Sequence, residues 1–471
     1  MVEVDLDELD RPSCFSISQS TESTFMSTTR RFQAPKGTRD FLPADLVVRR
    51  HIETAWRDSS ILHGFEEIEG PTFESLGLYT LKSGDGIVDE LFSFRRAGGK
   101  EDYALRPEFT PTLARMVAAR GPGLPRPIKW FAIPTHFRAE RPQRGRLREF
   151  VQWNVDMLGL DGPEADAEVL STGLRALDRL GLDPSAVTVR LSHRDAVALA
   201  LESLGVSPGQ MQSAFELLDR RDKMDASIFA AKASEFGLDA DGLAAFDRLS
   251  RTRKPLQTDL SEIALEAGIP TRALGPMEGL RDALVNTGIA EWCHWDLGIV
   301  RGLAYYTGSV FEVHENGGGE RAIAGGGRYD GLVELMGGPP TTAVGFGMGD
   351  VVIGLVLKDR GLLEDIAVPS PEVFILSSSD ASDQVTIGVM SMLRRSGIHA
   401  RRSYRSTRNV GKLLGDASKA GARFAVILGS RAEQGMVDLK DLGEGVQETI
   451  AMTDLVSRII ELRSSQKAVR S

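Results

Sequence analysis

Residues Phe137–Gly159 read FRAERPQRGRLREFVQWNVDMLG, with five arginines between Arg138 and Arg148. The segments 128–138 and 148–157 each have the composition of a strand, and a polar loop that contains Pro and Gly separates them. Successive side chains of a strand point to opposite faces. The second strand is therefore predicted to have an apolar face of Val151, Trp153, Val155 and Met157, and an opposite face of Arg148, Phe150, Gln152, Asn154 and Asp156.

The second of these faces is a candidate binding site. If the two strands pair antiparallel, Arg138 shares this face with Gln152 and Asp156. A guanidinium, an amide and a carboxylate on one sheet face, under an arginine-rich loop, can hold a small zwitterion and a phosphate, because arginine matches carboxylate and phosphate oxygens in two-point fashion. The alternative is an amphipathic hairpin with a merely hydrated polar face, which is an ordinary arrangement.

The whole stretch closely resembles motif 2 of the class II aminoacyl-tRNA synthetases. It has the histidyl-tRNA synthetase form, FRxERPQxGRxREFxQ, with a carboxylate four residues after the Gln. The resemblance implies a site for histidine, ATP and the acceptor end of tRNA. It implies that Arg138 holds the α-phosphate and the histidine carboxylate, Glu140 and Arg146 bind ATP, Gln143 and Arg144 face the tRNA, Gln152 holds the α-amino group, and Asp156 reads the imidazole.

Composition is that of a globular protein with about two to four domains. The chain has 471 residues, of which 42% are hydrophobic and 26% charged. No apolar run is long enough for a membrane span. Cys14 and Cys293 form no CxxC pair, which disfavours a disulfide framework or a cysteine-based zinc site and fits the cytosol. The net charge of −10 argues against a basic nucleic-acid coat, although residues 372–471 are mildly basic, with 15 Lys or Arg against 11 Asp or Glu.

The N-terminal part begins with residues 1–30, which are rich in Ser and Thr and are predicted to be disordered. They lack the basic start and apolar stretch of a secretory signal, and either Met1 or Met26 could be the start. A helix is predicted from about Ala44 to His63, followed by a strand over Phe65–Gly70 that runs into a proline. This order resembles motif 1 of the class II synthetases and implies a homodimer, although helix–strand–Pro units are common.

The segment Asp102–Thr110, DYALRPEFT, places Glu108 and Thr110 on one face if it is extended. A carboxylate there could bind an ammonium group. The alternative is that Thr110 caps the following helix. LRPExT resembles the synthetase segment that holds the α-amino end of the amino acid, which implies that role for Glu108 and Thr110.

Helices are predicted over residues 163–182 and over most of 195–284, which resembles the helical insertion of histidyl-tRNA synthetases. Beyond it, the run RGLAYYTG sets an arginine beside two tyrosines, a phosphate partner next to aromatic walls with hydroxyl donors. A turn with surface tyrosines is the alternative. The family sequence is RGLDYYT. Arg301, Tyr305 and Tyr306 match it and are implied to bind histidine, with Arg301 stabilising charge on the phosphorus, whereas Ala304 replaces the Asp.

Two glycine-rich segments follow, Ile323–Leu332 (IAGGGRYDGL) and Ala343–Asp350 (AVGFGMGD). Neither has the order of a dinucleotide-binding or Walker A loop. Clustered glycines in strands permit close approach of a ligand or a backbone. The first resembles a histidyl-tRNA synthetase segment with Tyr329 near the histidine pocket, and the second resembles motif 3. The motif 3 arginine, which stacks on adenine and contacts the γ-phosphate, falls at Val352.

The C-terminal region, residues 372–465, alternates strands and helices after a linker over 367–371 and is predicted to be an open α/β domain. It resembles the anticodon-binding domain of class IIa synthetases, and a small unrelated α/β module is the alternative. The fold class predicted for the whole chain is a multidomain α+β and α/β protein built on the antiparallel class II sheet. The expected domains are 31–194 with 285–366 (catalytic), 195–284 (insertion) and 372–465 (anticodon-binding).

The resemblance covers residues 32–465 and implies a cytoplasmic, ATP- and Mg²⁺-dependent ligase that joins L-histidine to tRNA(His), with no membrane association. Two alternatives remain. A non-catalytic regulator of ATP phosphoribosyltransferase is favoured by Ala304 and Val352 and opposed by the C-terminal domain and the intact motif 2. A tRNA-sensing protein is opposed by the lack of a recognisable kinase domain.

Overall fold

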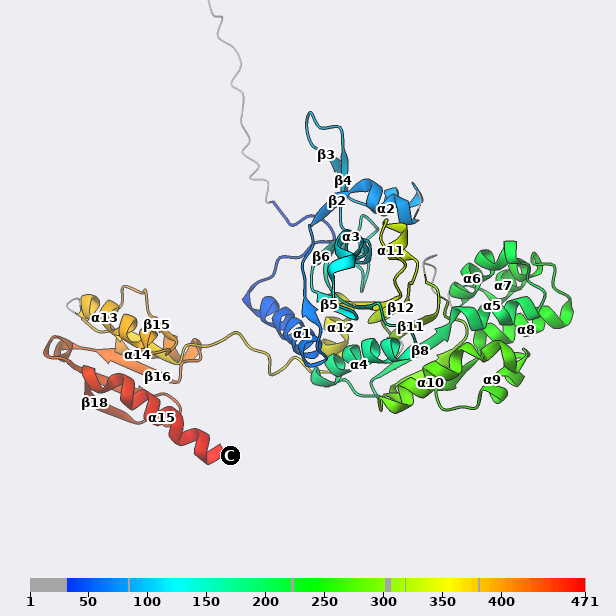
Figure 1. The fold of residues 1–471 in the computed structure, drawn as a ribbon. Coiled ribbons are helices and arrows are strands. Elements are labelled where there is room, and N and C mark those ends of the chain that lie inside the picture. The colour runs from blue at the N-terminus through cyan, green and yellow to red at the C-terminus, as the bar shows by residue number, and fades with distance from the viewer. Residues whose placement is uncertain are drawn as a thin grey trace, which may run out of the picture.

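A computed structural model describes residues 32–83, 85–221, 224–300, 306–317, 319–379 and 382–470. The predicted disordered extension 1–30 and Cys14 lie outside this part of the chain. Figure 1 shows a central body around a large sheet, a lobe of helices beside it, and a C-terminal domain joined to the body by an extended connection. Among the described helices, none has the length and apolarity needed to cross a membrane.

The large sheet has the strand order β1-β5-β7-β13-β12-β11-β8-β10-β9, with β6 paired to one end of β7. Its pairs are antiparallel except β1 with β5 and β8 with β10. The predicted class II architecture is thus confirmed, with β7 in the interior between β5 and β13. The bounds are β1 (Glu66–Glu67), β5 (Ile128–Ala132), β6 (Thr135–Phe137), β7 (Glu149–Leu158), β8 (Val187–His193), β9 (Arg253–Pro255), β10 (Cys293–Asp296), β11 (Ser309–Glu315), β12 (Ala324–Arg328) and β13 (Ala343–Gly349).

The arginine-rich loop joins antiparallel strands, as predicted, but the first strand is not continuous. The predicted strand 128–138 is divided into β5 and β6, which both pair with β7. The strand is interrupted at Pro134, because proline has no N–H to donate to a ladder of backbone hydrogen bonds. Its carbonyl oxygen instead accepts a hydrogen bond from the backbone N–H of Gln152 at 3.1 Å.

The apolar face of β7 packs against helices, which confirms the predicted alternation. Trp153 is fully buried and stacks on Trp56 of α1 (Pro43–Leu62), with ring centroids 5.9 Å apart. Its indole N–H donates to the Ser60 hydroxyl at 3.0 Å. Helices α4 (Pro163–Arg179) and α12 (Asp350–Asp359) contact the same strand. This packing fixes which face of the sheet is left for a ligand.

The segment before motif 2 differs from the prediction in two places. The strand expected over Phe65–Gly70 is only the short β1. Strand β4 (Asp102–Leu105), which pairs with β2 (Phe73–Ser75) and β3 (Ser93–Arg95), ends before Arg106, and α3 (Thr110–Arg120) begins at Thr110. Glu108 and Thr110 therefore do not share a strand face. Pro107 ends the ladder because it has no N–H to donate.

The helical lobe contains α5 (Arg194–Ser203), α6 (Met211–Asp219), α7 (Ala226–Ser234), α8 (Ala240–Arg251), α9 (Leu260–Ala267) and α10 (Pro276–Asn286). The predicted helix 163–182 is α4. The lobe is not purely helical, because β9 pairs antiparallel with β10 and extends the large sheet. This strand ties the predicted insertion to the body.

The C-terminal domain has a sheet in the order β15-β14-β16-β17-β18, which confirms the predicted open α/β arrangement. Its core clusters consist of residues between 373 and 462. The bounds are β14 (Val373–Ser377), α13 (Ser382–Arg395), β15 (Ala400–Arg402), α14 (Val410–Lys419), β16 (Phe424–Leu428), β17 (Met436–Asp441), β18 (Gln447–Ala451) and α15 (Leu455–Arg470).

Candidate active site

Two joined cavities lie on the polar face of β7. The smaller has a volume of about 90 Å³ and the larger about 770 Å³. Arg138, Gln152, Gly325 and Gly347 line both, so the cavities meet at these residues. The structure thereby brings together seven of the predicted histidine-binding residues in the smaller cavity: Glu108, Thr110, Arg138, Gln152, Asp156, Tyr306 and Tyr329.

Asp156 is the buried acid of the smaller cavity. Its Oδ1 accepts a hydrogen bond from the Tyr329 hydroxyl at 2.6 Å, and only 4% of the residue is exposed. Burial raises the pKa of Asp156 to about 7, although the hydrogen bond from Tyr329 opposes this. Tyr306, which the resemblance also implies to bind histidine, lines the same cavity, and its predicted role stays a prediction.

The glycines of β13 leave space for side chains of the neighbouring strand β7. A Cβ atom added at Gly345 would lie 2.0 Å from Oδ1 of Asp156, and one added at Gly347 would lie 2.0 Å from Nε2 of Gln152. Both side chains therefore lie across a strand that must lack side chains at these positions. Within the described residues, Oε1 of Gln152 is buried without a hydrogen-bond partner, which leaves an acceptor available to a ligand.

Arg138 is held where the two cavities meet. Its Nε donates to the carbonyl oxygen of Pro107 at 3.1 Å, and its guanidinium lies 5.0 Å from the centroid of the Phe150 ring. Burial lowers the pKa of Arg138, whereas the nearby Glu108 and Glu140 act in the opposite direction. The side chain is thus oriented by the protein before any ligand binds.

The loop between β6 and β7 closes in a tight turn. The backbone groups of Gln143 and Arg146 exchange hydrogen bonds of 3.0 and 2.9 Å, and Gly145 adopts φ 74°. Arg146 forms an ion pair with Glu140, while Arg144 pairs with Glu320 and, at 2.8 Å, with Asp359. The roles predicted for Gln143 and Arg144 towards tRNA stay predictions.

The described residues do not include Arg301, Ala304 and Tyr305. The roles predicted for Arg301 and Tyr305 therefore stay predictions. Val352 is buried, at 7% exposure, and lines the larger cavity.

Two residues of the site region, Asp350 and Arg321, were missed by the sequence reasoning. Asp350 lies at the start of α12 and accepts hydrogen bonds from Arg39 at 2.6 Å and from the backbone N–H of Val151 at 2.9 Å. It thereby ties the N-terminal segment to β7. Arg321 lines the larger cavity from the connection between β11 and β12. Asp350 belongs to the segment that resembles motif 3 but received no predicted role, and no motif included Arg321. In the described part of the chain, no group of three or more His, Cys, Asp or Glu is placed to hold a metal ion.

Comparison with known proteins agrees with this geometry. The family model for histidyl-tRNA synthetase matches residues 37–349, and the model for an anticodon-binding domain matches residues 372–462. Histidine–tRNA ligases of Opitutus terrae and Pyrococcus abyssi are 39% and 36% identical, over 87% and 91% of this chain and 94% and 98% of their own lengths.

Solved structures share the fold. The histidyl-tRNA synthetase of Nostoc sp. PCC 7120 superposes with a TM-score of 0.72 at 23% identity, covering 92% of this chain and 99% of that one. The apo enzyme of S. aureus gives a TM-score of 0.68 at 25% identity, covering 91% and 100%. The sequence matches extend over both the body and the C-terminal domain. The chain therefore belongs to the histidyl-tRNA synthetase family.

Proposed function

We propose that the protein is a histidine–tRNA ligase that activates histidine with ATP and transfers it to tRNA(His). One observation carries the proposal: a small cavity with a buried acid and an open amide acceptor meets a large cavity at Arg138. The small cavity is suited to an amino acid with a polar, titratable side chain. The large cavity offers the space and the arginines that a nucleoside triphosphate requires.

In the first step, the histidine carboxylate attacks the α-phosphorus of ATP, the bond to the β-phosphate oxygen breaks, and pyrophosphate leaves. Catalysis of such transfers depends on positioning and charge stabilisation. Arg138 is placed to hold both the carboxylate and the α-phosphate. Glu108, Thr110 and Gln152 hold the α-amino group, and Asp156 accepts a hydrogen bond from the imidazole. Arg301 is proposed to stabilise the phosphorus centre.

In the second step, a terminal ribose hydroxyl of tRNA attacks the histidyl carbonyl carbon, and AMP leaves. Gln143 and Arg144 lie on the loop that would meet the acceptor end, and the C-terminal domain would hold the anticodon. Mg²⁺ is proposed, from the family resemblance, to bind with the outer phosphates of ATP. A cytoplasmic homodimer is proposed from the family resemblance.

Exchange of labelled pyrophosphate into ATP tests this function, with each of the twenty amino acids supplied in turn. We expect exchange with histidine alone. The alternative is a non-catalytic regulator of ATP phosphoribosyltransferase, and Val352 at the motif 3 arginine position is the observation that supports it. One solved structure that superposes with a TM-score of 0.69 is described as an ATP phosphoribosyltransferase regulatory subunit/histidyl-tRNA synthetase. Absence of exchange with every amino acid would favour that alternative.

The raised pKa of Asp156 predicts the pH dependence of histidine use. Asp156 has a pKa of about 7, and the imidazole of free histidine has one of about 6.5. Above pH 7 the Asp156 carboxylate can accept a hydrogen bond from the N–H of the neutral imidazole, so binding needs no change of protonation. Below pH 6.5 both groups are protonated and binding must release a proton. We expect kcat/KM for histidine to be level above pH 7 and to fall about tenfold per pH unit below pH 6.5.

The Asp156→Asn variant is the matched control, because it keeps the volume and removes the titration. It should lower kcat/KM for histidine above pH 7, because the charged acceptor is lost, and keep only the acid fall that comes from free histidine. A profile of kcat/KM against pH in Asp156→Asn that equals the wild-type profile would contradict the assignment of Asp156 to the imidazole. The measurement is pyrophosphate exchange at several histidine concentrations across pH 5.5–8.5, a range chosen around both pKa values.

A further inference from the structure

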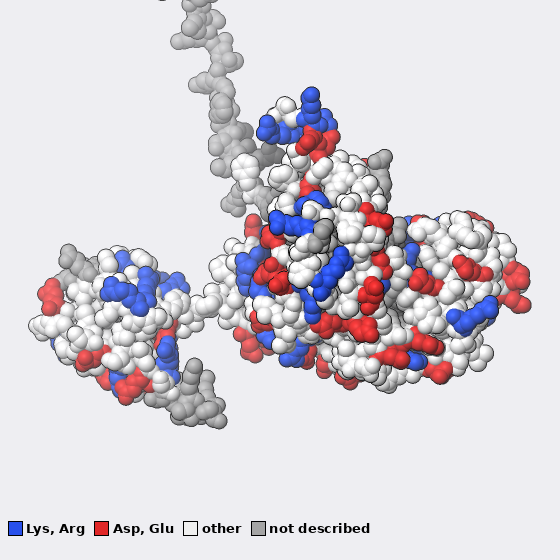
Figure 2. All heavy atoms as spheres, viewed as in Figure 1, with Lys and Arg blue, Asp and Glu red and all other residues white. Residues whose placement is uncertain are grey.

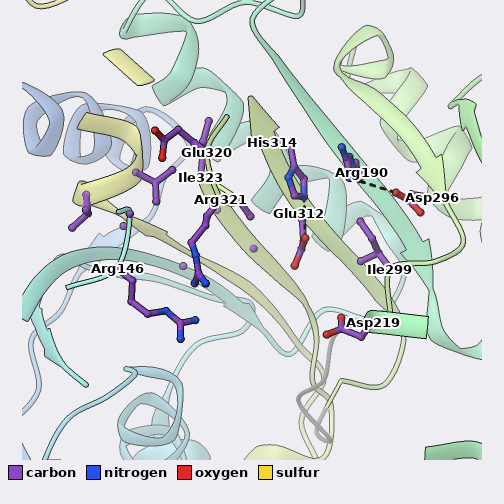
Figure 3. Close-up of a pocket in the computed structure, with 18 of the residues that line it drawn as sticks. Arg146, Arg190, Asp219, Asp296, Ile299, Glu312, His314, Glu320, Arg321 and Ile323 are labelled. Carbon is purple, nitrogen blue, oxygen red and sulfur yellow. Dashed lines mark hydrogen bonds and ion pairs between the residues drawn. The ribbon is translucent and has the colours of Figure 1, made fainter. Parts of the chain in front are cut away.

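Arg321 brings a cation to the larger cavity from a part of the chain remote from motif 2. It lies on the connection between β11 and β12, and Figure 3 shows its guanidinium directed into the cavity towards that of Arg146. The residue is exposed, so the guanidinium is open to a ligand. It lies in a different segment of the chain from the arginines of the loop.

Three segments meet at this point. A Cβ atom added at Gly145 would lie 3.5 Å from Cγ2 of Val352, 3.7 Å from Cδ of Arg321 and 3.7 Å from Oε2 of Glu320. The turn of motif 2, helix α12 and the β11–β12 connection are therefore in contact around Gly145. Arg321 and Val352 thus both lie close to Gly145, and Val352 presents only an aliphatic side chain to the cavity.

The nearby carboxylates do not neutralise Arg321. Glu320, its neighbour in sequence, pairs with Arg144, and Glu140 pairs with Arg146. Within the described part of the chain, Arg321 forms neither a hydrogen bond nor an ion pair. Partial burial and the charge of Arg146 both lower the pKa of Arg321. Two guanidinium groups that face one cavity, one of them without a partner, form a site for an anion with several oxygens.

The direction of a bound triphosphate follows from the arginines. Arg138 lies where the amino-acid cavity joins the larger one, so the α-phosphate belongs there. Arg146 and Arg321 line only the larger cavity of the two. The β- and γ-phosphates would therefore extend towards them.

We propose that Arg321 binds the γ-phosphate of ATP and supplies, from the β11–β12 connection, the positive charge that α12 lacks at Val352. This inference rests on the proposed use of ATP by the site. Because the γ-phosphate leaves in pyrophosphate, the contact also places Arg321 on the leaving group. Its main effect is on ATP affinity, since the bond that breaks is at the α-phosphorus.

Calorimetric titration with Mg²⁺–ATP and with AMP, without histidine, tests the inference in the full-length protein. Arg321→Ala should weaken ATP binding about tenfold or more, as expected for a lost charge-assisted hydrogen bond, and leave AMP binding unchanged. The double variant Arg321→Ala/Val352→Arg should regain ATP affinity, because the new side chain enters the same space. Arg175→Ala is a control, because Arg175 pairs with Asp178 on the surface of α4 and does not line the cavity.

Unchanged ATP affinity in folded Arg321→Ala would overturn the inference. Equal losses of ATP and AMP affinity would also overturn it, since they would show a structural effect without selectivity for the outer phosphates. The proposed function fails separately, by absence of histidine-dependent exchange in the wild-type protein. The binding titrations do not depend on that reaction, so the two failures are distinguishable.

Discussion

Arg138→Ala is expected to reduce the rate of histidine-dependent pyrophosphate exchange by about 10²–10³-fold, the usual cost of one lost donor to transition-state charge. Arg138 lies at the junction of the two cavities and is oriented by the Pro107 carbonyl and the Phe150 ring. Water that fills the space left by the guanidinium would not carry a fixed charge. The loss should therefore appear mainly in kcat.

The variant Arg138→Lys distinguishes the contribution of the positive charge to the exchange rate from that of the side-chain geometry. Lysine keeps the positive charge but lacks the planar fork that contacts two oxygens at once, so its rate should lie between those of the wild type and Arg138→Ala. Thermal unfolding shows whether each variant is folded. The surface variant Arg175→Ala controls for removal of an arginine. Wild-type exchange in folded Arg138→Ala would refute the assigned role.

The second large effect is expected from removal of the C-terminal domain. A chain that ends at Pro371 should retain exchange and lose most of its tRNA charging. The core clusters of this domain contain no residue from the body, and those of the body contain none from the domain. Every described residue that lines the two joined cavities precedes residue 353. The chemistry of activation should therefore survive the truncation.

The C-terminal domain has features expected of a surface that binds tRNA. A cavity of about 220 Å³ is lined by Arg402, Arg405 and Arg408, and the guanidinium of Arg402 lies 4.6 Å from the centroid of the exposed Tyr404 ring. Figure 2 shows a basic patch on this domain, apart from the acidic groups along the body. Phosphate contacts weaken with added salt, and exposed aromatic rings can stack on bases.

Both activities of the full-length and truncated proteins should be measured across a salt series. Charging by the full-length protein should fall more steeply with salt than exchange does. Arg402→Ala/Arg405→Ala in the full-length protein is a finer test, because it should reduce charging at constant exchange. If the truncated protein charges tRNA as well as the full-length one, residues 372–465 do not form an anticodon-binding domain.

The local sequence was sufficient to predict the faces of β7, and the family resemblance supplied most residues of the smaller cavity. Alternation along one strand is a short-range property, and it assigned Trp153 to the core and Gln152 and Asp156 to the opposite face. The closely spaced glycines of motif 3 predicted a close approach, which the structure places against those two side chains. The helix of the segment that resembles motif 1 and the alternation of strands and helices in the C-terminal domain were likewise predicted from local patterns.

Only the tertiary structure showed where β5 ends and that Tyr329 is a hydrogen-bond partner of Asp156, and it decided for a helix start at Thr110 over an extended segment. It also brought Arg321 beside Val352 and Gly145, although these residues lie in three different segments. Hydrophobic periodicity reports which face of one element is buried. Contact between elements depends on strand order and on how each connection crosses the sheet, and neither is encoded in the spacing of nearby residues.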